Sequence, residues 1–134
     1  MRWKLADETR YNEAVLGPLL LRADEDGKAR LRMFPQHRHT NLNDKVHGAV
    51  TLGLIDISMF AAFRLLSGGD AGGSVTLGLD TQFIGAGDPA KPLDAVIELL
   101  RETRRLAFLR GLVIQDDELV ASFSGTIRKP IERA

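Results

Sequence analysis

The sequence contains no cysteine. Disulfide bonds, a nucleophilic thiol and thiolate ligands for a metal are therefore all excluded. Histidine is also scarce: there are three, and no two of them have the spacing that would place a pair of metal ligands on one helix face. We therefore expect no dedicated zinc site.

An excess of either charge is also lacking, because 18 Lys and Arg side chains balance 18 Asp and Glu side chains. A chain without net charge produces no overall field that attracts nucleic acid or an anionic membrane surface. We therefore expect neither nucleic acid nor a membrane as a partner.

Long hydrophobic runs are nearly absent. The longest, residues 46–63, contains His47 and Asp56, whereas a membrane span needs about 20 predominantly apolar residues. This run is more typical of a buried core helix. The first eight residues carry mixed charges and lack the apolar stretch of a secretory signal. We expect a cytoplasmic protein with a single domain over residues 1–134, a length that suits one hydrophobic core.

Hydrophobic periodicity predicts one long helix. Residues 48–66 are apolar on all faces, which indicates a helix enclosed by other structure. The residues Ser67-Gly68-Gly69 are typical of a helix end. A second, short helix is expected over residues 3–17.

The other apolar segments predict β-strands, and polar turns join two pairs of them into hairpins. Residues 93–104 also have the spacing of a helix, but their position between strands favours a strand. The expected strands cover residues 19–21, 29–34, 74–83, 93–104, 106–114 and 119–127. The whole predicts an α+β fold, with an antiparallel sheet wrapped around one buried helix.

Asp56 is the one ionisable residue between Gly48 and Phe63. Asp is unfavourable inside a helix, and this one is too far from either end to cap it. In an enclosed helix an unpaired carboxylate is energetically costly, and such a cost is typical of a functional site. The alternative is that Asp56 faces a solvated groove or caps a neighbouring segment.

His47 and Gly48 lie where a polar loop meets the start of the helix. The first turn of a helix has unpaired N–H groups and the positive end of the dipole, so it can stabilise a developing oxyanion. Glycine allows a substrate carbonyl to approach closely. The alternative is an ordinary helix start, with His47 hydrogen-bonded to the backbone.

His47 and Asp56 are nine positions apart. A continuous helix separates them by ~13.5 Å along its axis and by about half a turn around it. They can hardly act on one carbonyl within one chain. Either they belong to different sites, or a second chain supplies the missing partner, since a two-fold dimer would place each Asp56 opposite the partner subunit's His47.

Several short segments, in this order and spacing, resemble the hotdog-fold acyl-CoA thioesterases. The branch they resemble is the phenylacetate-degradation (PaaI-like) type, which includes thioesterase superfamily member 2. The resemblance covers roughly residues 35–128. It is carried by His39-Thr40-Asn41, His47-Gly48, Asp56, Ser74-Val75-Thr76-Leu77, Gln82-Phe83-Ile84 and Arg105-Leu106-Ala107-Phe108.

The resemblance implies a role for each matched position. The backbone N–H of Gly48 would polarise the thioester carbonyl, and His47 and Asn41 would orient the thioester or the attacking water. Asp56 of the facing subunit would be the general base or nucleophile, and Ser74 would supply a hydroxyl that assists the water. Asn43 is a substitute for Asn41, and Ala49 stands where the family commonly has a second glycine, which bears on substrate size.

The resemblance also implies acyl-CoA as the substrate and a homodimer or homotetramer with active sites between subunits. It implies no metal or redox cofactor, because coenzyme A is part of the substrate. Coenzyme A carries phosphates, so basic side chains should lie at the pocket mouth. The candidates are Lys91, Arg104, Arg105, Arg128 and Lys129. The candidates for lining an acyl tunnel are Leu54, Ile57, Ser58, Phe60 and Ala61, although most of these are expected to be core residues.

Two alternatives to a thioesterase share the same scaffold. One is a dehydratase or hydratase acting on acyl thioesters, which typically pairs a His with a carboxylate. The set Asn41, His47, Asp56 and Ser74 fits the hydrolase pattern better. The other is a non-catalytic module that binds acyl-CoA, because a fold by itself does not establish turnover.

Overall fold

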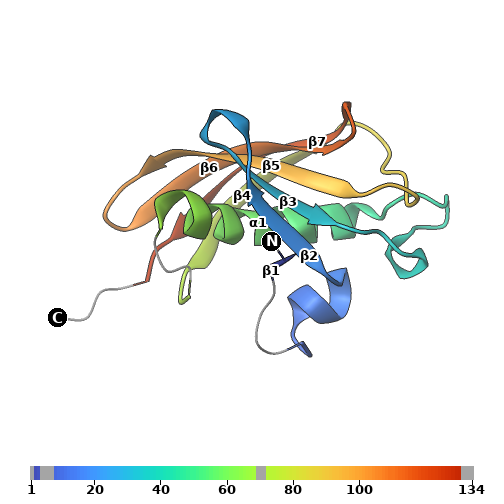
Figure 1. Ribbon diagram of the computed structural model, residues 1–134, viewed down its shortest axis with the longest axis horizontal. Helices are drawn as coiled ribbons and strands as arrows, with labels where there is room; N and C mark the ends of the chain where they lie inside the picture. Colours follow the sequence, from blue (N-terminus) through green and yellow to red (C-terminus); the bar gives the residue numbers. More distant parts are fainter. Residues whose placement is uncertain (1, 4–7, 69–71, 131–134) are drawn as a thin grey trace.

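A computed structural model describes residues 2–3, 8–68 and 72–130. Seven strands form one antiparallel sheet in the order β1-β2-β3-β5-β6-β7-β4. Figure 1 shows this sheet curving over the long helix α1, which runs along its inner face. The strands are β1 (Arg2–Trp3), β2 (Leu19–Ala23), β3 (Ala29–Met33), β4 (Val75–Phe83), β5 (Leu93–Glu102), β6 (Leu106–Gln115) and β7 (Glu118–Arg128). The helices are α1 (Gly48–Ser67) and the short η1 (Asn12–Leu16), η2 (Glu25–Gly27) and η3 (His37–His39).

These elements confirm the expected α+β fold and most of the predicted boundaries. Helix α1 begins at Gly48 and ends at Ser67, followed by Gly68 in the left-handed conformation with φ of 72°. A glycine adopts that conformation without the steric cost that a Cβ imposes. Residues 93–102 form a strand, as their position between strands predicts.

The predicted helix over residues 3–17 is wrong at its start. Trp3 lies in β1, which pairs with β2, and residues 4–7 are outside the described part. Among the described residues of this segment, helical structure is confined to the single wide turn of η1. Trp3 packs beside the core as part of a sheet edge, a tertiary contact that local spacing does not reveal.

The hydrophobic core lies between α1 and the inner face of the sheet. Fully buried side chains of the helix pack against fully buried side chains of the strands. Of the residues considered for an acyl tunnel, Phe60 is half-buried and the other four are buried in the core. Representative core residues are Leu31, Leu54, Ile55, Met59, Phe63, Ile97, Leu109 and Ile127.

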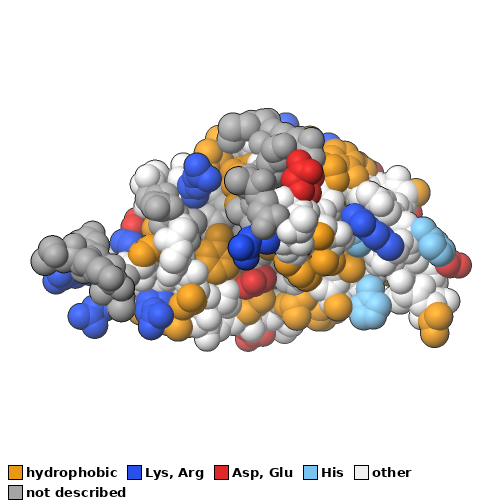
Figure 2. All heavy atoms as spheres, turned by 90° about the horizontal axis from the view of Figure 1, so that it is seen from below, with side chains coloured by type: hydrophobic (Ala, Val, Ile, Leu, Met, Phe, Trp, Pro, Cys, Tyr) orange, Lys and Arg blue, Asp and Glu red, His pale blue; other side chains and the backbone are white. Residues whose placement is uncertain are grey.

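Helix α1 is covered on one face only, not on all faces. It has the length and hydropathy of a membrane span, yet half of its most apolar window is buried inside the protein. The uncovered face carries Ala49 and Leu52, which are both exposed, whereas Asp56 is half-buried and is bonded to β4. Figure 2 shows the helix side of the molecule, with hydrophobic side chains distributed over it. Contacts within one chain therefore bury only part of the apolar surface of the helix.

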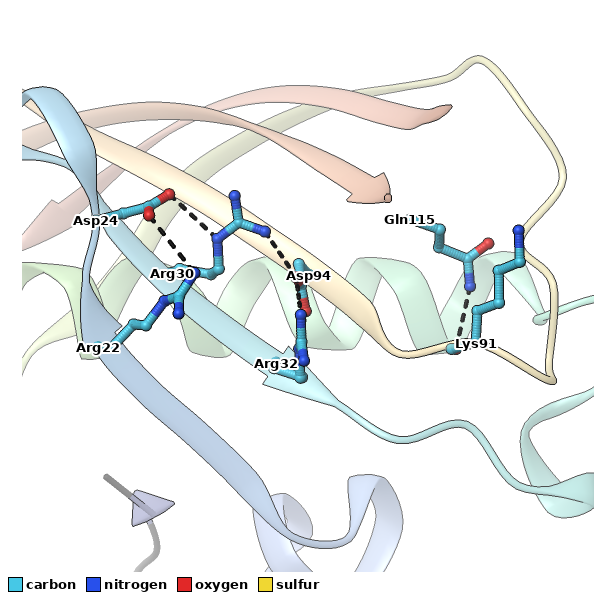
Figure 3. Close-up of polar contacts among 7 residues, drawn as sticks. All are labelled: Arg22, Asp24, Arg30, Arg32, Lys91, Asp94 and Gln115. Atoms are coloured by element: carbon cyan, nitrogen blue, oxygen red, sulfur yellow. Dashed lines mark hydrogen bonds and ion pairs between the residues drawn. The ribbon is translucent and has the colours of Figure 1, made fainter. Parts of the chain in front are cut away.

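An ion-pair network joins β3 to β5 on the outer face of the sheet. Asp94, which is 3% exposed, accepts hydrogen bonds from Arg32 Nε at 2.7 Å and from Arg30 Nη1 at 2.7 Å. Arg30 also contacts Asp24 through a 3.1 Å hydrogen bond from its Nε (Figure 3). Burial by itself would raise the pKa of Asp94, but the hydrogen bonds from Arg32 and Arg30 outweigh burial and hold the pKa below its ordinary value.

Replacing Asp94 by Asn is expected to lower the free energy of unfolding at pH 7 by about 2 kcal/mol, because two guanidinium groups lose charged hydrogen bonds. The folded-state pKa is lowered, so this stabilisation is present above the unfolded pKa of about 3.9 and is lost as pH falls through the folded value. Urea unfolding of both proteins from pH 7 to pH 3 measures it. The exposed Asp117→Asn change is the control, and a wild-type advantage that persists undiminished at pH 3 would contradict the assignment.

Candidate active site

The first turn of α1 has one backbone donor left over. The His47 imidazole Nδ1 accepts the Ala49 N–H at 3.0 Å, and the His47 carbonyl accepts those of Val50 and Thr51 at 2.9 and 3.2 Å. Within the described part of the chain, the Gly48 N–H has no acceptor. It therefore remains available to a ligand, at the positive end of the helix dipole.

An exposed aromatic ring lies beside this donor. A Cβ built on Gly48 would lie 3.5 Å from the ring of Phe83, which is the last residue of β4 and is 56% exposed. Ordinary van der Waals contact at this distance means that the ring flanks the helix start without crowding it. Gly48 and Phe83 therefore form one rim of a site that is open in the single chain.

His47 and Asn41 organise the backbone that leads into the helix. The imidazole of His47 is exposed and caps α1. This hydrogen bond to the backbone is what the alternative of an ordinary helix start predicts. The side-chain oxygen of Asn41 accepts the N–H groups of Asn43 at 2.9 Å and of Lys45 at 3.2 Å. The Asn41 oxygen is thus committed to its own turn, whereas its amide N–H groups are not used by that turn. Asn43 is exposed.

His39 supports this loop from inside the protein. It is 2% exposed; its Nδ1 accepts the Gln36 N–H at 2.9 Å, and its Nε2 lies 2.6 Å from the carbonyl oxygen of Val15. A carbonyl only accepts, so Nε2 carries the proton. The His39 carbonyl in turn accepts the His47 N–H at 2.8 Å. His39 therefore holds the helix start in place from behind.

Asp56 lies half-buried in the middle of α1 and is paired with a hydroxyl on β4. Thr76 Oγ1 donates a hydrogen bond of 2.6 Å to Asp56 Oδ1. Sequence reasoning named Ser74 for this position and did not single out Thr76. The two residues are two positions apart, so an extended chain directs both to the same side. Ser74 Oγ is buried and has no hydrogen-bond partner among the described residues.

The two parts of the site lie at opposite ends of β4. Gly48 is beside Phe83 at the end of the strand, and Asp56 is bonded to Thr76 near its start. Seven residues of extended strand separate Thr76 from Phe83 by roughly 23 Å. Within one chain the Gly48 N–H and the Asp56 carboxylate are therefore far apart, in agreement with the helical spacing of His47 and Asp56.

The basic candidates divide between the two ends of the sheet. Lys91 lies just before β5 and pairs with Asp116 at 3.5 Å, whereas Arg104 and Arg105 lie in the turn after β5. Arg105 is next to the end of β7, because its carbonyl accepts the Lys129 N–H at 2.7 Å. The three residues therefore do not form one cluster within a chain.

The side chain of Lys129 already binds other residues of the chain. Its Nζ lies 2.6 Å from Glu102 Oε1 and donates to the Thr103 carbonyl at 3.0 Å. The hydrogen bond from Lys129 lowers the pKa of Glu102. Among the residues that the structure describes, no group of three His, Asp or Glu side chains is placed to hold a metal ion.

A comparison with protein families identifies the family of the chain. Residues 36–128 match the family described as the acyl-CoA thioesterase N-terminal domain. The chain belongs to this acyl-CoA thioesterase family. It is a thioester hydrolase, and the matched range agrees with the span over which the sequence resembles hotdog thioesterases. No curated protein matches this thioesterase.

Solved structures confirm the hotdog fold of this thioesterase. A conserved protein of Pseudomonas aeruginosa is 27% identical, with a TM-score of 0.76 over 90% of this chain and 94% of that one. A mutant of the phenylacetic acid degradation protein PaaI of Thermus thermophilus is 23% identical, with a TM-score of 0.73 over 89% and 97%. Mouse thioesterase superfamily member 2 is 18% identical, with a TM-score of 0.74 over 90% of each chain. The last two have the fold that the resemblance to the PaaI-like branch implies.

Proposed function

We propose that this thioesterase hydrolyses an acyl-CoA in a site shared by two copies of the chain. In this proposal the Gly48 N–H of one subunit binds the thioester carbonyl oxygen, and Asp56 of the facing subunit is the general base or nucleophile. The observation that carries it is the position of the two groups, a free N–H and a threonine-bonded carboxylate, at opposite ends of one edge strand.

Strand β4 has the properties of an interface with a second copy. It is the last strand of the sheet, so one edge of its backbone has no neighbouring strand within the described residues. Exposed apolar side chains accompany this edge, and an unprotected apolar edge strand favours pairing with another chain. They are Val75, Leu77, Phe83 and Ile84, with exposed fractions of 40%, 56%, 56% and 53%.

A two-fold pairing of β4 with its copy would complete both half-sites. An antiparallel pair centred near Leu79, the middle residue of β4, sets the Thr76 end of each strand beside the Phe83 end of the other. Asp56 of one subunit then faces Gly48 of its partner, twice per dimer. The pairing also covers the exposed side of α1, which explains why that helix is apolar beyond the face that meets the sheet.

The chemistry of hydrolysis suits these groups. The Gly48 N–H would stabilise the oxyanion as water adds to the carbonyl carbon, and Asp56 would accept a proton from that water. The C–S bond then breaks, and the coenzyme A thiolate leaves and takes up a proton. If Asp56 attacks directly, a mixed anhydride forms and water hydrolyses it. The Thr76 hydroxyl would hold the carboxylate in orientation.

The other residues are assigned around this centre. We place His47 and Asn41 at the Gly48 side. There the Asn41 amide N–H groups, which have no acceptor among the described residues, would orient the thioester or the water. Ser74 would be a second hydroxyl at the Asp56 side, because its buried oxygen has no partner within the described chain.

Coenzyme A would be held at its phosphates by both subunits. Lys91 follows the Phe83 end of β4, whereas Arg105 lies near the strand's start, since Val75 and Leu106 are both opposite Arg128 in the sheet. The two-fold pairing brings the first end of one subunit beside the second end of the other. Lys91 of one subunit and Arg104 and Arg105 of its partner would then flank the same site.

The oxyanion role can be tested by removing the Gly48 N–H. Gly48 is the first helical residue, a position where proline is favoured, and His47 has φ of −63° and ψ of 137°, which a following proline accepts. Gly48→Pro should therefore keep the helix start but remove the N–H, and kcat should fall by about 10²–10³-fold. Thiol release from acyl-CoA measures it.

Gly48→Ala is the matched control. It keeps the N–H, and its methyl group would meet the Phe83 ring at an ordinary 3.5 Å. Its loss of kcat should be at least tenfold smaller than that of the proline variant, if the main requirement is the donor. Equal activity of Gly48→Pro and wild type would exclude this N–H as the oxyanion donor.

A further inference from the structure

Gln115 is a buried amide at the end of β6 whose hydrogen bonds all go to one loop. It is 4% exposed; its Nε2 donates to the carbonyls of Asp88 at 2.7 Å and Lys91 at 3.2 Å, and its Oε1 accepts the Asp88 N–H at 2.7 Å. Figure 3 shows the side chain reaching from the strand to Lys91. The bonded loop, residues 84–92, connects β4 to β5.

That loop is bonded in turn to the residues that precede α1. The Gly87 carbonyl accepts the Val46 N–H at 2.9 Å. The two backbones approach so closely that a Cβ on Gly87 would lie 2.9 Å from Val46 Cβ, a distance that real side chains do not tolerate. Val46 is 6% exposed and is two residues before Gly48. A continuous series of contacts therefore runs from Gln115 through Asp88 and Gly87 to the start of the helix.

We propose that Gln115 is a positioning residue for catalysis, acting through the 84–92 loop and Val46 to hold the Gly48 N–H in its orientation. The inference rests on the proposed role of that N–H. An oxyanion donor works only within a narrow range of distances, and a displacement of about 1 Å can reduce the rate on the order of 100-fold. The three hydrogen bonds of this buried amide are directional, so they restrict the position of the loop backbone.

The position of Gln115 also separates an effect on rate from an effect on binding. Lys91 is the part of this loop proposed to contact coenzyme A, and its side chain is 46% exposed and flexible enough to absorb a small shift of its backbone. The Gly48 N–H is a backbone group and cannot compensate in this way. Loosening the loop should therefore lower kcat much more than it raises KM.

The test compares Gln115→Met with Asp94→Asn. Methionine has nearly the length and volume of glutamine but makes none of the three hydrogen bonds. Asp94→Asn is the matched control, because Asp94 is another buried polar side chain, is opposite the neighbouring Ile114 in the sheet, and bonds only to the outer-face arginines. Both variants are expected to be destabilised, and only the first should loosen the loop.

For wild type and both variants we would measure kcat and KM for an acyl-CoA that the wild type hydrolyses, together with hydrogen exchange of the Val46 amide by NMR. Gln115→Met should lose roughly 10- to 100-fold in kcat with less than about a threefold change in KM, and its Val46 amide should exchange at least about tenfold faster. Asp94→Asn should leave both unchanged at temperatures well below its Tm. Unchanged kcat in Gln115→Met, or an equal loss in Asp94→Asn, would overturn the proposal.

Failure of the proposed function would look different. In that case the wild type releases no thiol from any acyl-CoA, and the Val46 amide alone decides whether Gln115 holds the helix start. Faster exchange in Gln115→Met would support the positioning role independently of turnover, and unchanged exchange would refute it.

Discussion

Replacing Asp56 by Asn is expected to lower kcat for acyl-CoA hydrolysis by about 10²–10⁴-fold, the range that a positioned general base contributes. The amide has the shape of the carboxylate and still accepts the hydrogen bond from Thr76 through its oxygen. Fold and assembly should therefore be retained while the base, or the nucleophile, is lost. A thiol-release assay over aromatic, short-chain and long-chain acyl-CoA measures the effect.

The control for this variant is Asp117→Asn, which removes a carboxylate of equal charge from the exposed turn between β6 and β7. It should hydrolyse the same substrates at the wild-type rate. The best substrate of the wild type in this panel also identifies the acyl group that the pocket accepts. Normal turnover by Asp56→Asn would rule out the assigned role of this residue.

Placing a charge on the free edge of β4 is expected to abolish activity by separating the subunits. Leu77 is 56% exposed on this strand, and Leu77→Asp puts an unpaired charge on the apolar surface that a second copy would cover, where its desolvation is costly. The variant should be a folded monomer with less than about 1% of wild-type turnover, because in the proposed site each chain supplies only part of the catalytic groups. Sedimentation measures the assembly, and circular dichroism verifies the fold.

Leu112→Asp is the control, because Leu112 is comparably exposed, at 44%, but lies on β6 in the middle of the sheet. It should keep the β4 pairing and its activity. A fully active Leu77→Asp monomer would show that each chain contains a complete site.

Mixing two inactive variants provides a second test of the shared site. Asp56→Asn and Gly48→Pro each damage both sites of their own homodimer. In a mixed dimer one site contains both changes and the other contains neither, so random exchange of subunits should restore about a quarter of the wild-type activity. If Gly48 and Asp56 acted within one chain, no activity would return.

The secondary structure was largely predictable because each element satisfies a local rule that the long-range contacts do not oppose. Helix α1 has an apolar run, a His at its cap position and a glycine at its end, and all three are read directly from the chain. The strand over residues 93–102 was decided by its neighbours, because its apolar spacing fits a helix equally well. The prediction of a helix over residues 3–17 was wrong at its start, because Trp3 pairs with Leu19. This is a long-range contact, which local spacing does not reveal.

The candidate site was predictable at Gly48 and Asp56 for two reasons. A helix start has free N–H groups by geometry, and a carboxylate inside an apolar helix is conspicuous. Their separation along the helix predicted either two different sites or one site completed by a second chain, and in the structure the two groups lie at the two ends of β4.

The sequence by itself determined the α+β class, the long helix, its lone carboxylate, the free donor at its start and the likeness to hotdog thioesterases. Only the tertiary structure decided that Thr76 bonds Asp56, that Phe83 flanks Gly48, and that Gln115 ties the 84–92 loop to the residues before the helix. Side-chain hydrogen bonds between distant segments depend on sheet register and on where the helix crosses the sheet. Those properties arise from the packing of the whole chain, and no local pattern encodes them.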